Sequence, residues 1–162
     1  NDKISLRYNA LTDEMEMSLN SSSTDSDNVL IKNNKVSCII NNEKYKYLGF
    51  TPENSNPIIG YLSVLYLGNS LTLYERKKKI YMQATKARTS LERPFPARYT
   101  DKIEYYFSIN NGSIFEIKIN KKDLFRKLNS YGESIKNYLS LNKIKIRSKE
   151  DLLSLFKYLD VN

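Results

Sequence analysis

The chain has 162 residues, of which 40% are hydrophobic and 12% aromatic, and it carries a formal net charge of +8. This apolar content is sufficient for one hydrophobic core and argues against an intrinsically disordered chain. With one cysteine and no histidine, the sequence excludes an internal disulfide, a Cys/His zinc site and a Cys/His nucleophile pair.

Short alternating runs in the first part of the chain predict antiparallel strands joined by tight turns. These strands are expected over residues 3–10, 13–19, 29–32, 36–40 and 45–50. The polar stretch NSSSTDSDN, residues 20–28, is expected to be a hairpin loop. Further on, Val36, Cys38 and Ile40 fall on one strand face, so Cys38 is predicted to be a small buried hydrophobic residue.

A second group of strands follows the Pro-bracketed loop at residues 51–57. Residues 58–81 predict a hairpin with its turn at 68–70. Because the strand before this turn is apolar on both faces, we expect a central strand that is covered on one side by helices. Another hairpin is predicted over residues 103–119, with its turn at 110–112.

From residue 120 the hydrophobic period lengthens from two to nearly four, which predicts helices. Three capping pairs mark the expected helix starts: Asn120 with Asp123, Ser130 with Glu133, and Ser148 with Asp151. The last helix, over residues 149–160, carries an apolar stripe at i, i+3, i+4 and i+7: Leu152, Leu155, Phe156 and Leu159. We therefore expect a single α+β domain over residues 1–162, mainly β over 1–119 and mainly helical over 120–162. Its antiparallel sheet is expected to have about six to nine strands, with two to three C-terminal helices packed on it.

Basic residues are concentrated between Tyr74 and Arg98. This segment holds eight basic and two acidic residues, a net charge of +6 out of the chain's +8, with aromatic residues interleaved. Such a composition is typical of a surface that binds phosphates or another acidic partner. The candidate partner-binding residues are Arg76, Lys77, Lys78, Lys79, Lys86, Arg88, Arg93, Phe95 and Arg98. Phe95 lies between Pro94 and Pro96, which hold it on a stiff, extended segment suited to docking.

Two simpler interpretations of this segment remain open. Lys-rich strand edges often block edge-to-edge pairing, which would make the segment a solvated basic loop, and Pro-flanked stretches often serve as rigid linkers. Since the sequence has no RNP, KH or helix-turn-helix signature, a protein partner or another acidic component is favoured over nucleic acid.

Catalysis would have to proceed without histidine. Asp13, Glu14 and Glu16 are candidate carboxylates for a glycosidase, but they are expected on the wet side of a strand. The stretch TDSDN lacks the length and terminal acid of a calcium loop, and the chain has no G-x-S-x-G, S-x-x-K or glycine-rich phosphate motif. We therefore expect no catalytic residue, no cofactor and no metal site, with a carboxylate-based hydrolase as the alternative. No window approaches about 18 apolar residues, so no transmembrane helix is predicted.

The order of several segments resembles a family of exported proteins common in Bacteroidota, to which no activity is assigned. The resemblance covers the hairpin at 60–80, PFPARY at 94–99, EYYFSINNGSIFEIK at 104–118 and the Lys-rich tail at 121–160, and also the start at 6–17. The Ser-rich loop departs from the shorter turn of that family. The resemblance implies an upstream signal peptide, now removed, and a periplasmic or outer-membrane-associated location. It implies no catalytic residue.

Together these features predict a non-enzymatic, exported binding or accessory module of the cell envelope. We expect it to contact a protein partner or an acidic envelope component through the basic segment. A protein that binds polyanions or nucleic acid is the alternative. The sequence leaves the oligomeric state and the identity of the partner open.

Overall fold

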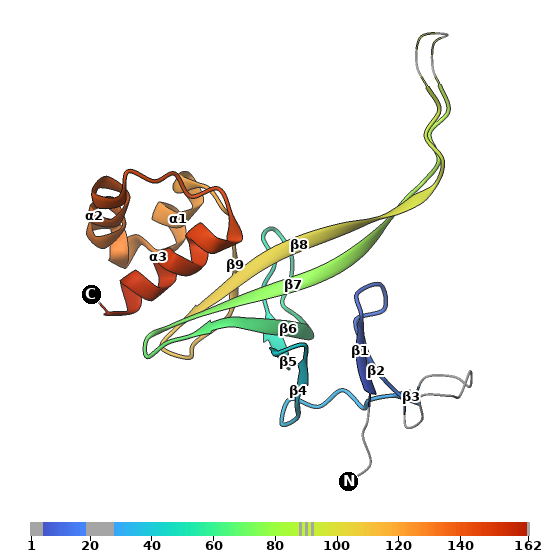
Figure 1. Cartoon of the computed structure of the whole chain (residues 1–162), viewed down its shortest axis with the longest axis horizontal. Helices are drawn as coiled ribbons and strands as arrows, with labels where there is room; N and C mark the ends of the chain where they lie inside the picture. The colour runs from blue at the N-terminus through green and yellow to red at the C-terminus, as the bar shows by residue number, and fades with distance from the viewer. Residues whose placement is uncertain (1–4, 19–27, 88, 90, 92, 162) are drawn as a thin grey trace. The chain divides into compact units, whose positions relative to one another are not determined.

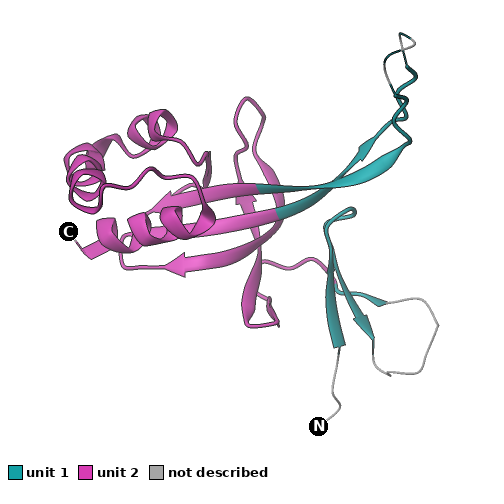
Figure 2. Ribbon diagram, turned by 45° about the horizontal axis from the view of Figure 1, so that its top comes forward, with its two compact units in different colours: residues 1–30, 77–103 teal, residues 31–76, 104–162 magenta. Residues whose placement is uncertain are grey.

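The structure of the protein is a computed structural model that describes residues 5–18, 28–87, 89, 91 and 93–161. The backbone contacts divide the chain into two compact units (Figure 2). Unit 1 comprises Asn1–Leu30 and Lys77–Ile103, and unit 2 comprises Ile31–Arg76 and Glu104–Asn162. The α+β class, with strands first and helices last, is confirmed. The single domain stays a prediction. Most of the predicted loop at 20–28 and the candidate residue Arg88 lie outside the described residues.

Unit 1 contains a three-stranded sheet in the order β1-β2-β3. Its strands are β1 (Ser5–Asn9), β2 (Glu14–Ser18) and β3 (Asn28–Val29). Met15 is fully buried on β2, as the alternation of this strand predicts. β3 is shorter than the strand predicted over 29–32, and Ile31 is 84% exposed.

The second sheet has six strands in the order β4-β5-β6-β7-β8-β9, so strands that follow one another in the sequence also pair (Figure 1). They are β4 (Ser37–Ile40), β5 (Glu43–Phe50), β6 (Ile58–Leu67), β7 (Leu71–Met82), β8 (Arg98–Ile109) and β9 (Phe115–Ile117). β7 and β8 contribute residues to both units. The turn predicted at 68–70 is confirmed, because β6 ends at Leu67 and β7 begins at Leu71.

Asparagine pairs form two of the turns. Asn41 and Asn42 between β4 and β5 have φ values of 49° and 66°, and Asn110 and Asn111 after β8 have φ values of 49° and 56°. Asparagine tolerates this left-handed conformation better than most residues, and two such residues in succession give a turn whose twist matches that of the flanking strands. The turns predicted at these positions are therefore confirmed.

Three helices follow the sheet: α1 (Lys121–Lys127), α2 (Gly132–Asn142) and α3 (Lys149–Val161). Two predicted caps form. The side chain of Asn120 accepts the N–H of Asp123 at 2.9 Å, and Ser148 and Asp151 cap α3 reciprocally at 3.0 and 3.1 Å.

The capping pair predicted at Ser130 and Glu133 was wrong. Residues Asn129–Tyr131 form a 3₁₀ turn, and the N–H of Ser130 donates to the side chain of Asn129 instead. Helix α2 therefore begins at Gly132, without a side-chain cap.

The helices cover one face of the six-stranded sheet within unit 2 (Figure 1). The predicted apolar stripe of α3 is fully buried against Leu71 and Leu73 of β7 and Phe107 of β8. On the opposite face, Tyr74 of β7 and Tyr106 of β8 belong to a second, smaller cluster. Since neighbouring residues of a strand point to opposite faces, β7 packs on both sides.

The turn between β6 and β7 is held by the C-terminal end of α3. The Asp160 carboxylate accepts hydrogen bonds at 2.7 Å from three backbone N–H groups, those of Asn69, Ser70 and Leu71. It also accepts a hydrogen bond at 3.0 Å from the hydroxyl of Tyr66. Burial alone would raise the pKa of Asp160, but these four donors together keep that pKa below its ordinary value.

Replacing Asp160 by alanine should lower the free energy of unfolding by about 2 kcal/mol, because the turn loses its charged acceptor. The measurement is urea unfolding of the two proteins at neutral pH. Glu133→Ala is the control, since the Glu133 side chain is 82% exposed and its ion pair with Lys136, at 3.8 Å, lies on its own helix. An unchanged unfolding midpoint for Asp160→Ala would show that the hydrogen bonds to Asp160 do not stabilise the fold.

The hydrogen bonds to Asp160 also predict how the free energy of unfolding depends on pH. The pKa of Asp160 is lower in the folded state than in the unfolded state, where it is about 4. The contribution of Asp160 to the free energy of unfolding is therefore fully present above the unfolded-state pKa and is lost as pH falls through the folded-state pKa. The stability difference between the natural chain and Asp160→Asn should therefore be constant above about pH 5 and shrink at lower pH.

Candidate functional site

Most of the predicted partner-binding residues lie in Lys77–Ile103, the part of unit 1 that we call the basic arm. Its two sides are the end of β7 and the start of β8, which lie side by side (Figures 1 and 2). Beyond these strands Thr85 and Phe95 form an antiparallel bridge, in which each N–H donates to the other's carbonyl at 2.9 Å. The arm is therefore a paired two-stranded element at least as far as this bridge. Up to that point it is not an irregular loop.

The base of the arm is attached to the β1–β2 hairpin of the same unit. The N–H of Lys79 donates to the carbonyl of Ala10 at 2.9 Å. The hydroxyl of Tyr8 lies 3.2 Å from the carbonyl of Lys77 and 2.7 Å from the carboxylate of Asp13. These contacts fix the position of β7 within unit 1.

Seven described cations lie on the arm: Lys77, Lys78, Lys79, Lys86, Arg93, Arg98 and Lys102. By sequence the whole arm holds eight basic and two acidic residues, a net charge of +6. Lys79 and Asp101 form an ion pair at 3.6 Å, with side chains 50% and 79% exposed, and a pair so exposed contributes little to stability. The arm therefore carries a large net positive charge, and Lys86, Arg93 and Arg98 are exposed on it.

Aromatic rings lie among these charges. The rings of Tyr81 and Tyr99 are 5.3 Å apart between centroids, and the guanidinium of Arg98 lies 5.5 Å above the ring of Phe95. The three aromatic residues remain 53%, 55% and 57% exposed, respectively. Exposed apolar groups that cluster in this way mark an interaction surface more often than isolated ones do. The arm thus combines cations with open aromatic rings.

Two of these features were missed from the sequence. The contact between Tyr81 and Tyr99 depends on how β7 and β8 pair, which the spacing of the residues along the chain does not specify. Lys102 lies beyond Arg98, where the predicted basic segment ends. Because β8 begins at Arg98 and continues past Lys102, Lys102 also lies on the arm.

Arg76 differs from the other predicted residues because it belongs to unit 2. Its side chain is only 11% exposed, lies 3.7 Å from the Glu104 carboxylate and stacks over the ring of Phe50 at 4.9 Å. Glu104 also accepts a hydrogen bond from the Tyr106 hydroxyl at 2.9 Å. Since the charge of Arg76 is neutralised inside unit 2, we exclude this residue from the candidate surface.

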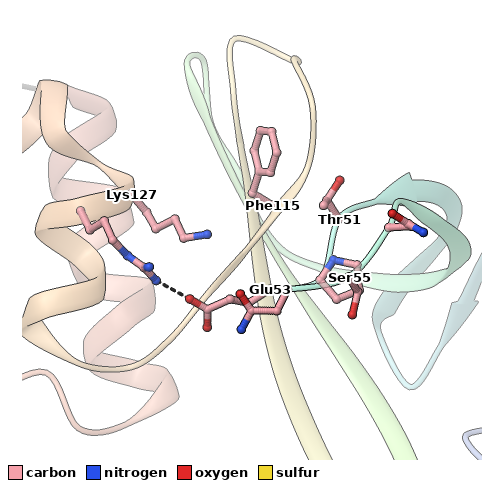
Figure 3. Close-up of a pocket in the computed structure, with 9 residues that line it drawn as sticks. Thr51, Glu53, Ser55, Phe115 and Lys127 are labelled. Carbon is pink, nitrogen blue, oxygen red and sulfur yellow. Dashed lines mark hydrogen bonds and ion pairs between the residues drawn. The ribbon is translucent and has the colours of Figure 1, made fainter.

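A depression of about 690 Å³ lies beside the loop that joins β5 and β6. Figure 3 shows Glu53 of this loop facing α1, the helix that carries Lys127. The Glu53 carboxylate forms ion pairs with Lys118 and Arg126, and Arg126 also contacts Asp123. The hydrogen bonds from Lys118 and Arg126 lower the pKa of Glu53 to about 2.

A carboxyl with so low a pKa stays ionised at neutral pH and has little tendency to transfer a proton there. Glu53 is therefore suited to holding α1 against the loop rather than to general acid or base chemistry.

Glu16 of β2 is also engaged in hydrogen bonds. The Glu16 carboxylate accepts hydrogen bonds at 2.7 Å from Asn9 and Arg7, and these bonds lower its pKa. The described parts of the chain contain no group of three or more cysteine and carboxylate side chains placed to hold a metal ion. The predicted buried position of Cys38 is confirmed, and burial raises the pKa of its thiol.

The pKa of Glu53 can be tested by titrating its side-chain carboxyl with carbon-detected NMR. We expect a midpoint near pH 2, well below the usual value for glutamate. In Arg126→Met the midpoint should move upward, because one of the two cationic donors is lost. Lys127→Met is the control, since Lys127 lines the same depression without an ion pair to Glu53 in the structure. Equal midpoints in all three proteins would show that the ion pairs do not set this pKa.

Comparison with known proteins identifies no relative of this chain: no family model matches, and no match is found among the curated proteins or the solved structures. The resemblance to exported proteins stays a prediction. Within the described ranges, no helix combines the length and the apolar character that crossing a membrane requires.

Proposed function

We propose that the protein is a non-enzymatic binding module that contacts an acidic protein partner through the basic arm. The observation that carries this proposal is the exposure of Tyr81, Phe95 and Tyr99 among the cations of a paired two-stranded element. Tyrosine and arginine supply much of the binding energy at protein interfaces, while rim charges mainly accelerate and orient the encounter. The arm provides both kinds of group.

The pairing of the two strands also favours binding. The hydrogen bonds between Thr85 and Phe95 hold the two sides of the arm together at this bridge before any partner arrives. Less conformational entropy then has to be lost on association, which improves affinity for a given contact area. A solvated loop of the same composition would lack this advantage.

We further propose that the protein acts in the cell envelope as an exported accessory module. This part of the proposal rests on the resemblance of the segments at 60–80, 94–99, 104–118 and 121–160 to exported proteins. An acidic, non-protein component of the envelope is the other partner that the charge of the arm would suit.

The test is copurification of the tagged chain from detergent-solubilised envelope of the native host, with a wash at about 0.5 M salt, where charge screening acts within a few ångströms. We expect one stoichiometric protein to be retained. Phe95→Ala should weaken binding of that protein at least fivefold, because an exposed aromatic anchor is lost. The backbone bridge to Thr85 does not require the Phe95 ring, so the arm should keep its pairing.

A charge variant separates the contribution of the cations from that of the aromatic rings. Lys86→Glu with Arg93→Glu should slow association and reduce its salt dependence, because less attraction remains for salt to screen. Lys44→Glu with Lys157→Glu is the matched control, since it makes the same charge change on exposed residues of unit 2. Equal effects of the two double variants would place the contact outside the arm.

Nucleic acid is the second candidate partner, because a two-stranded β-ribbon fits the major groove of DNA. It predicts an affinity that falls steeply between low and moderate salt as counterions are released. If only polyanions are captured, and the salt wash removes them all, the protein-partner proposal is wrong.

A further inference from the structure

A second cavity of unit 2, about 720 Å³ in volume, lies between α2 and the extended connector that leads to α3. Its apolar lining comes from Ile119 before α1, Leu139 on α2, and Ile144 and Ile146 on the connector. Ile146 is 7% exposed and Ile144 packs against the main core, so the floor of the cavity is continuous with the interior of unit 2.

The connector has this lining because its sequence alternates. Lys143 ends α2 in the left-handed conformation, with φ of 52°, and the chain then continues in an extended form. In an extended segment successive side chains point to opposite sides. Ile144 and Ile146 are therefore turned inward, whereas Lys145 and Arg147 are exposed.

The rim of the cavity is strongly basic. Five cations line it: Lys121, Lys136, Lys143, Lys145 and Arg147. None of the described residues that line it is acidic. Lys136 has a long, exposed contact of 3.8 Å with Glu133, but the side chains of Lys143, Lys145 and Arg147 form no ion pair with a carboxylate of the described ranges. The site therefore has an apolar interior and an unbalanced positive edge.

We propose that this cavity binds a single-chain anionic amphiphile, a fatty acid. The acyl chain would lie against the isoleucine and leucine side chains, and the carboxylate would be held by the cations of the rim. The volume is within the range of small-molecule sites, which are concave and mostly apolar with a few orienting polar groups. Charge complementarity selects an anion, and the apolar floor selects a ligand with a hydrocarbon chain over a simple ion.

This site is separate from the basic arm in the chain and in chemistry. The arm presents aromatic rings on an exposed ribbon, whereas the cavity presents aliphatic side chains below a ring of cations. Neither proposal depends on the other.

The first experiment is isothermal titration calorimetry of the full chain with octanoate, decanoate and dodecanoate, each below its micelle concentration. We expect saturable binding of one ligand per chain, with affinity rising up to roughly fourfold per added methylene, as burial of hydrocarbon predicts. Dodecanol, which has the same chain and no charge, should bind at least about tenfold more weakly, because it cannot pair with the rim cations.

Two variants assign the binding to this cavity. Lys145→Glu with Arg147→Glu should weaken the binding of dodecanoate at least about tenfold, while the dependence of affinity on chain length is preserved. Ile144→Ser should reduce the dependence on chain length while preserving the preference for dodecanoate over dodecanol. Lys44→Glu with Lys157→Glu, the same charge change away from the cavity, should leave binding unchanged. The unfolding midpoint of each variant confirms that it is folded.

Several outcomes would overturn the proposal. Absence of saturable binding to the natural chain would do so, and so would affinity that is independent of chain length, because binding would then be a surface charge effect. Equal affinity in the natural chain and in both cavity variants would place the ligand elsewhere. If one variant does not fold, the other variant and the chain-length series still decide the question.

Discussion

The structure of unit 2 depends on how α3 is joined to the β6–β7 hairpin. The apolar stripe of the helix supplies the attraction to the sheet, but such packing has little direction of its own. The Asp160 carboxylate adds direction, because it satisfies three backbone N–H groups of the turn that have no partner within a strand. Gly68 is required beside it, since any side chain there would collide with this carboxylate. Helix α2 then packs on α3, where the rings of Tyr138 and Tyr158 lie 5.0 Å apart.

The same sheet supplies both a core and a surface because β7 changes character along its length. From Leu71 to Glu75 each residue is buried, and the two faces of the strand belong to different apolar clusters. Arg76 is the last residue of unit 2 on this strand and pairs with Glu104 on β8. From Lys77 onward the strand belongs to unit 1 and becomes progressively exposed. Adjacent basic residues on one strand therefore have different roles, and position relative to the core decides which.

Features that depend on local periodicity were predictable from the sequence. The stripe of α3, the asparagine turns and the cap at Ser148 each follow from residues a few positions apart, and the structure confirms them. The start of α2 was not predictable in this way, since the Asn129 side chain accepts the N–H of Ser130 and residues Asn129–Tyr131 form a 3₁₀ turn before the helix. The pairing within the basic arm, and the approach of Ile119 to Leu139 and Ile144 in the α2 cavity, bring together residues that are not neighbours in the sequence. Spacing along the chain carries no information about such contacts.

Positive charge alone does not distinguish the two surfaces, because both the arm and the cavity rim carry several cations. Charge acts over about 8 Å at physiological ionic strength, so it raises the rate of encounter with any acidic molecule at either place. What remains bound after encounter is decided by the apolar groups beneath the charge. On the arm these are flat aromatic rings that are open to one side, which suit contact with another folded surface. In the cavity they are aliphatic side chains at the bottom of a confined space, which suit a flexible hydrocarbon chain. The shape of the apolar part, rather than the number of lysines, therefore separates the ligands of the two surfaces.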